Sequence, residues 1–230
     1  MHAPDGFIDA PTSIAMGALA AGGVGLALRK AGADLDEKRV PLAGLVSAFI
    51  FAVQMLNFPV AGGTSGHLMG GVLAAVLLGP WVGSLCVTVV VVVQALLFAD
   101  GGLTALGFNV VNMALVTALG GYLVFVGLRK VLPKTRSGVV VASGIAAGVS
   151  VVLTSLAFSL EYAIGGTGGA SVATVTTSMV SVHVLIGIGE GIITALTVGA
   201  VLASRPDLVW GARDLPAASL AADDLVGAAS

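Results

Sequence analysis

Seven long apolar runs, separated by short polar segments, dominate the pattern of the chain. They lie at about residues 12–28, 41–58, 66–79, 81–98, 105–128, 138–160 and 178–203. A helix needs about 17 to 25 residues to cross a bilayer, so most of these runs predict spanning helices. The third run is short, and Gly79 and Pro80 separate it from the fourth. The alternative is one long, kinked helix over residues 66–98.

The placement of basic residues favours seven helices over six. All ten fall in three groups: Arg29, Lys30, Lys38 and Arg39; Arg129, Lys130, Lys134 and Arg136; Arg205 and Arg213. With seven helices and the N-terminus outside, all three groups lie in cytoplasmic segments, as the positive-inside rule requires. We therefore predict an all-α, polytopic transmembrane bundle over residues 1–204, followed by a flexible cytoplasmic tail over residues 205–230.

Composition agrees with a multi-pass protein of the cell membrane. Hydrophobic residues make up 57% of the chain and charged residues only 10%, whereas a soluble domain carries roughly 25% charged residues. The basic residues form no extended patch, so no nucleic-acid partner is expected. The first eleven residues contain no Lys or Arg and therefore lack the basic region of a signal peptide. We expect Met1 to be retained because His2 is a large residue.

Candidate chemistry centres on the three histidines, His2, His67 and His183. In the predicted topology His2 and His67 lie on the outer side. A free Met1-His2 terminus offers an amine, the His2 amide and the ring Nδ1, and His67 could supply a fourth nitrogen. Four nitrogens that include a deprotonated amide favour Ni(II) or Cu(II) over zinc, which prefers tetrahedral sites. The alternative is an incidental histidine, since terminal residues are commonly disordered.

Four segments carry a family resemblance. They are MHAPDGF at the start, GTSGHLMGGVLAAVLLGPW at 63–81, QALLFADGGLTALGFNVVNMALV at 94–116 and HVLIGIGEGIITAL at 183–196. With these segments the chain resembles the CbiM/NikM family, the substrate-specific membrane subunits of energy-coupling factor (ECF) transporters for cobalt and nickel. The resemblance implies that the leading residues tuck into the bundle. It also implies that the Met1 amine, the His2 amide and ring, and His67 hold Ni²⁺ or Co²⁺ as transported substrate, with no organic cofactor.

The resemblance also implies partners. They are a coupling transmembrane subunit and two ATPase subunits, and a small accessory membrane subunit is a further candidate. The chain has no GxxxxGK[ST] phosphate-binding loop of its own, so ATP hydrolysis requires separate subunits. A stripe of small residues, Gly44, Ala48 and Ala52, permits close helix contact and is a candidate docking surface for the coupling subunit.

One segment departs from the family pattern. Members often have AHGG where this chain has Ala99, Asp100, Gly101 and Gly102. We interpret Asp100 either as attracting or orienting the cation near the outer surface or as a plain helix terminus, and Asp5 has the same two interpretations. Thr64 and Ser65 are candidates for orienting His67 from behind.

Other polar residues lie within the apolar runs. His183 and Glu190 are seven residues apart on one face of the last helix, and ionisable groups inside a membrane are functional candidates. They pair with each other, line the passage or fix helix packing, and we favour structural support or subunit coupling. Four amides read as hydrogen-bonding packing residues; they are Gln54, Asn57, Asn109 and Asn112.

Two rival functions are weaker. Residues 63–66 spell the GxSG of rhomboid intramembrane proteases, with Ser65 as nucleophile and His183 as general base. Rhomboids also carry a Trp-Arg loop, and this chain has no Arg between Arg39 and Arg129. A self-sufficient channel or carrier would show internal repeats or a continuous polar path, and we find neither. We therefore predict a transport component and not an enzyme.

Overall fold

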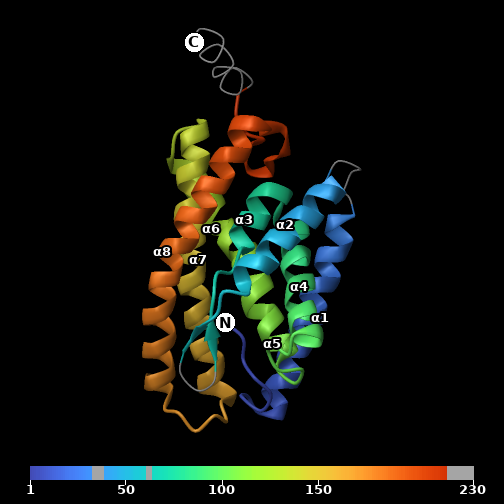
Figure 1. Cartoon of the computed structure of the whole chain (residues 1–230), viewed down its shortest axis with the longest axis vertical. Coiled ribbons are helices and arrows are strands. Elements are labelled where there is room, and N and C mark those ends of the chain that lie inside the picture. The colour runs from blue at the N-terminus through green and yellow to red at the C-terminus, as the bar shows by residue number, and fades with distance from the viewer. Residues whose placement is uncertain (33–38, 61–63, 217–230) are drawn as a thin grey trace.

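In the computed structural model, which describes residues 1–32, 39–60 and 64–216, the chain is a bundle of helices (Figure 1). The helices are α1 (Ala10–Ala31), α2 (Arg39–Gln54), α3 (Gly71–Leu78), α4 (Pro80–Leu97), α5 (Leu106–Val110), the π-helix η2 (Val111–Gly120), α6 (Gly121–Val131), α7 (Arg136–Gly165) and α8 (Val172–Ser204). Two short strands, β1 (Phe58–Pro59) and β2 (Ser65–Gly66), pair antiparallel, and two 3-10 turns follow α8, namely η3 (Pro206–Leu208) and η4 (Trp210–Ala212).

The predicted all-α bundle of seven helices is confirmed. Helices α5, η2 and α6 run on without a break from residue 106 to 131 and count as one. Within the described residues, five helices are long and apolar enough to cross a membrane; they are α1, α4, residues 106–131, α7 and α8. Helix α2 is shorter, at 16 residues.

Local sequence sets where the long helices begin. The side chain of Asp9 accepts the Thr12 amide at 2.9 Å, which caps α1. Ser171 does the same for α8, accepting the Thr174 amide at 3.1 Å. Such caps satisfy amide groups that the first turn of a helix leaves free. They fix the points at which the chain enters the bundle.

The third apolar run is the part that differs from expectation. Residues 66–70 are not helical, and α3 begins only at Gly71. Its eight residues are all buried, so α3 is a short internal helix and does not span a membrane. The non-helical stretch that precedes it therefore lies inside the bundle.

Helices α3 and α4 are separate, so the alternative of one kinked helix is wrong. Gly79 between them has a φ of 93°, which favours glycine, and Pro80 starts α4. A Cβ added at Gly83 would lie 2.6 Å from the Ala75 amide nitrogen. Residues eight apart in one continuous helix would be about 12 Å apart. The chain therefore doubles back at Gly79.

Charge divides the two ends of the bundle. Described Lys and Arg residues lie in the last turns of α1 and α6, in the α6–α7 connection, at the starts of α2 and α7, and after α8. These points share one end, at the top of Figure 1, which we call the basic end. The opposite end carries the α7–α8 connection and the start of α1. This segregation matches the predicted topology; Lys38 lies outside the described residues.

The first part of the predicted tail packs against the basic end. Val209, Ala212 and Leu215 are buried, and Arg129 of α6 donates to both carboxylate oxygens of Asp214 at 3.2 and 3.1 Å. The ring of Trp210 lies over the α3–α4 turn, with the Arg213 guanidinium 3.2 Å from its centroid. Apolar side chains thus hold residues 205–216 in place, where we had predicted flexibility. Residues 217–230 lie outside the described residues.

We expect Gly83→Ala to lower the thermal unfolding midpoint of the purified protein, because the added methyl group meets the α3 backbone. Overpacking of this kind costs about 1 to 3 kcal/mol. The matched control is Gly127→Ala on α6, where an added Cβ meets nothing within 4 Å. Equal midpoints for the two variants would contradict the close α3–α4 contact.

Candidate metal centre

The N-terminus lies inside the bundle and not in a loose tail (Figure 1). Met1 and Ala3 are 0% exposed and His2 is 3% exposed. Phe7 is also buried. The centroid of its ring lies 4.9 Å from that of Tyr162 and 5.4 Å from that of Phe158. The incidental-tail interpretation of His2 therefore fails, because the segment that carries it is packed.

Hydrogen bonds to both sides of one residue hold this segment. The Asn109 side chain accepts the Ala3 amide at 2.8 Å and donates to the Ala3 carbonyl at 3.2 Å. The same carbonyl accepts the Gly102 amide at 2.9 Å. Farther along, the Asp9 amide donates to Gly165 at 2.7 Å and the Thr167 amide donates to Phe7 at 3.0 Å. The terminus is thus pinned at residue 3, two positions from the free amine.

The loop after α4 is shaped to admit the terminus. A Cβ at Gly101 would lie 2.7 Å from Nδ1 of His2, and one at Gly102 would lie 2.2 Å from the Asp5 amide nitrogen. Asp5 also binds this loop, because its Oδ1 accepts hydrogen bonds from both the amide and the hydroxyl of Thr104 at 2.7 Å. Glycine at 101 and 102 is therefore a requirement of the close approach.

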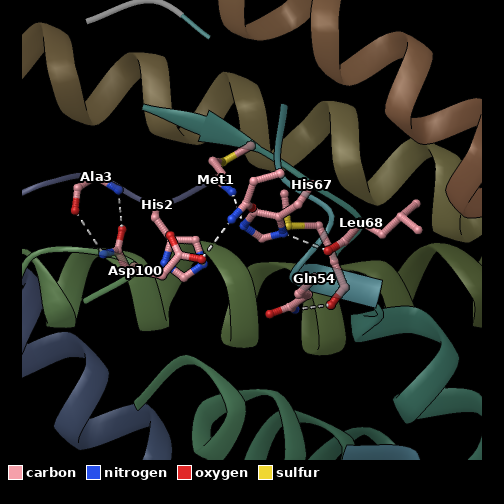
Figure 2. A network of polar contacts seen from close by, with 10 residues as sticks. Met1, His2, Ala3, Gln54, His67, Leu68 and Asp100 are labelled. Carbon is pink, nitrogen blue, oxygen red and sulfur yellow. Dashed lines mark hydrogen bonds and ion pairs between the residues drawn. The ribbon is translucent and has the colours of Figure 1, made fainter. Parts of the chain in front are cut away.

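His67 presents one defined lone pair to the terminus. It is 0% exposed, and its Nδ1 lies 2.7 Å from the Leu68 carbonyl. A carbonyl only accepts, so Nδ1 carries the proton and Nε2 is the acceptor. Figure 2 shows Nε2 in contact with the Met1 amine. The imidazole is thus held in the tautomer that a metal ligand needs.

His2 completes the group of nitrogen donors. Its ring centroid lies 4.8 Å from that of His67, and both of its ring nitrogens are buried without a hydrogen-bond partner. Burial lowers the pKa of the Met1 amine well below its ordinary value and that of His2 to about 2. Burial thus favours the uncharged forms of both groups, in which the nitrogens carry lone pairs. Buried polar atoms without partners are uncommon, and here they converge on one place.

A second set of bonds fixes the segment that carries His67. Glu190 of α8 accepts the Met69 amide at 2.7 Å and the Gly70 amide at 2.6 Å. Gln54 of α2 donates to the Met69 carbonyl at 2.7 Å. The carboxylate thereby satisfies two buried backbone amides in the non-helical stretch directly before α3, which would otherwise lack an acceptor. Glu190 acts as structural support, one of the roles expected for it.

Asp100 lies beside the donors. Its Oδ2 is 3.9 Å from Nε2 of His2 and accepts Nδ2 of Asn57 at 3.0 Å (Figure 2). Its side chain is 17% exposed, so it lies between the buried histidines and the surface. Of its two interpretations, proximity favours a role toward the cation.

Comparison with known proteins gives the family. A family model described as the cobalt uptake substrate-specific transmembrane region, CbiM, matches residues 2–208. The chain belongs to the CbiM family. A protein of Haloquadratum walsbyi that is named for metal transport is 42% identical, over 91% of this chain and 94% of that protein. The fused nickel transport protein NikMN of Rhodobacter capsulatus is 33% identical, over 95% of this chain and 66% of that protein.

A solved structure shares the fold. The crystal structure of a truncated transition metal transporter superposes with a TM-score of 0.81 at 32% identity, over 88% of this chain and 98% of that chain. The CbiM family and these relatives are transport proteins, which confirms that the chain does not belong to an enzyme family.

The geometry also argues against the rhomboid alternative. Ser65 Oγ and His183 Nε2 are both buried without a hydrogen-bond partner, so they do not bond to each other. His183 Nδ1 instead donates to the Met179 carbonyl at 2.7 Å. Thr64, expected to orient His67, donates its hydroxyl to Sδ of Met179 at 3.7 Å. Gly63 of the GxSG segment lies outside the described residues.

The positioning roles of Asn109 and Gln54 are the ones that the sequence missed. We predicted both as packing residues between helices. Instead, Asn109 bonds the backbone of Ala3, one residue from His2, and Gln54 bonds the carbonyl of Met69, two residues from His67. The available signal was a polar side chain in an apolar run. Gly44, Ala48 and Ala52 lie elsewhere, exposed on α2.

We expect Glu190→Gln to lower the stability of the purified protein by about 1 to 3 kcal/mol, because one backbone amide loses its acceptor and faces an NH₂ group. The measurement is thermal unfolding in detergent. The matched control is Glu161→Gln on α7, since Glu161 accepts a bond from Asn112 alone among the hydrogen bonds described, and a glutamine oxygen can still accept it. A larger loss for the control would argue against the bonds from Glu190 to the backbone before α3.

Proposed function

We propose that the chain is the substrate-capture component of an importer of Ni²⁺ or Co²⁺. The ligands would be the Met1 amine, the amide nitrogen and Nδ1 of His2, and Nε2 of His67. The observation that supports this best is the buried amine against the His67 lone pair, with the unpartnered His2 ring beside them. A terminus is seldom drawn into a hydrophobic core without a bound partner to offset the cost of burying it.

The donor set suits these ions. An amine, a deprotonated amide and Nδ1 of the second residue close fused five- and six-membered chelate rings, and a nitrogen-rich tetragonal site favours Ni(II) or Cu(II). Among the described residues no group of three or more His, Cys, Asp or Glu side chains lies together. A site here would therefore depend on the backbone nitrogens of the terminus. The family model is described for cobalt and one relative is named for nickel.

The orientation follows from charge. Described Lys and Arg residues gather at the basic end, which the positive-inside rule assigns to the cytoplasm. The loops of the opposite end would then face outward in the cell membrane, and the metal would enter from outside. Import from there would use the energy of ATP through a coupling transmembrane subunit and two ATPase subunits, with a small accessory membrane subunit as a further candidate.

Metal content tests the ligand set. We expect the protein with a native N-terminus to bind one nickel or cobalt ion per chain, and a version with residues added before Met1 to bind none. His67→Ala should weaken binding at least about tenfold, or about 1.4 kcal/mol, through loss of one ligand. His2→Ala should weaken it further, because the Nδ1 chelate ring is lost.

The matched control for the extension is the same added sequence placed after Ser230. If the N-terminally extended protein held metal at full stoichiometry, the terminal chelate would be wrong. The same measurement with both metals in competition gives the preference for nickel or cobalt.

The exposed stripe on α2 is the proposed docking surface for the coupling subunit. Ala48 faces away from the bundle, and an added Cβ at Gly44 meets nothing within 4 Å. We expect Ala48→Leu to reduce co-purification with the coupling subunit while metal binding stays intact, because the larger side chain holds the helices apart. Ala18→Leu, at an exposed alanine of α1, is the control. A complex that co-purifies undiminished would exclude this surface.

A further inference from the structure

A polar cavity of about 270 Å³ lies beside the nitrogen donors. It is lined by His2, Pro4, Asp5 and Ser65 together with residues 99–102 of the loop after α4. Asp5 is exposed and Asp100 is partly exposed, so the cavity reaches the surface. It thus adjoins solvent on one side and the buried terminus on the other.

The imidazole of His2, on the buried side of the cavity, has no hydrogen-bond partner. His2 is 3% exposed, neither of its ring nitrogens has a hydrogen-bond partner, and Nε2 lies 3.9 Å from Oδ2 of Asp100. The hydroxyl of Ser65 is likewise buried and unpartnered. A buried polar atom without a partner calls for water or an ion. These atoms face a space that is large enough for one.

The charge of the cavity selects a cation. Its two ionisable side chains besides His2 are the carboxylates of Asp5 and Asp100. The described Lys and Arg residues lie at the other end of the bundle. None of them therefore neutralises the two carboxylates in the cavity. A cavity lined by one sign of charge within low-dielectric walls concentrates ions of the opposite sign.

The volume fits a hydrated ion. One water occupies about 30 Å³ in the liquid, so an ion with about six waters needs on the order of 180 Å³. The cavity of about 270 Å³ exceeds this need. The cavity is therefore large enough to hold a divalent cation together with its water shell.

We infer that this cavity is an entry site for the hydrated divalent cation, in which Asp100 receives the ion before it passes to the nitrogen donors. The inference rests on the proposed function and adds a step to it. Carboxylate oxygens hold hydrated ions loosely, whereas the nitrogen set binds nickel more tightly, so transfer inward is downhill. Asp5 adds negative charge at the mouth of the cavity.

A different role for Asp100 makes a different prediction. If Asp100 only orients the His2 ring, as carboxylates often do for metal-bound histidines, its loss would speed metal release. An entry site instead governs how fast the metal arrives. The association and dissociation rate constants therefore separate the two roles.

The test uses the full-length protein with its native terminus in lipid nanodiscs. Association is followed by transfer of Ni²⁺ from a weak indicator dye, and dissociation by capture with excess chelator. We expect Asp100→Asn to slow association about tenfold and to leave dissociation within about twofold. Asp100→Glu should restore most of the association rate, and the control Asp207→Asn, at the basic end, should leave it unchanged.

Salt provides a test that needs no variant. Association of Ni²⁺ with the native protein should slow as ionic strength rises from about 0.01 to 0.15 M, because salt screens the carboxylates. An association rate independent of salt, or faster dissociation as the sole effect of Asp100→Asn, would overturn the entry site. If the native protein bound no nickel or cobalt, the proposed function would fail; if only His67→Ala lost affinity and Asp100→Asn behaved as native, the entry site alone would fail.

Discussion

Backbone inside a membrane needs a hydrogen-bond partner wherever it is not helical, and this constraint governs the centre of the molecule. Two non-helical segments lie within the bundle, residues 1–3 and residues 66–70. Asn109 and Gly102 satisfy the first at Ala3, and Glu190 and Gln54 satisfy the second at residues 69–70. The same bonds that make the segments tolerable also bring the Met1 amine to His67.

The centre therefore combines a backbone held by hydrogen bonds with side-chain and terminal nitrogens that lack ordinary hydrogen-bond partners. Its backbone is hydrogen-bonded at Ala3, Met69 and Gly70, while among the described residues the amine, the His2 ring and Nε2 of His67 have no donor or acceptor apart from one another and the nearby Asp100. Burial lowers the pKa of the amine and of the His2 ring and so disfavours their charged forms, because an ammonium or imidazolium loses its hydration there. A set of fixed, neutral lone pairs is ready for a cation, and little reorganisation would accompany its binding.

The two ends of the bundle are built differently. At the basic end, residues 205–216 cover the α3–α4 turn, and the Arg129–Asp214 pair and the Trp210 ring hold them there. At the other end, acidic side chains and glycine-rich loops leave a polar cavity beside His2. In the proposed topology, the centre is thus covered toward the cytoplasm and approachable from outside through the cavity.

Much of this protein could be predicted from its sequence. The apolar runs determined the helices and the ten basic residues determined their number, because hydrophobic length and loop charge act locally along the chain. The Met-His start and His67 marked the candidate donors. The sequence did not reveal that the third run begins with the non-helical residues 66–70, that Glu190 bonds the amides before α3, that Asn109 pins Ala3, or that residues 205–216 pack. Those features depend on which groups meet across the bundle, and only the tertiary structure decided them, since a buried amide takes whichever partner packing brings within reach.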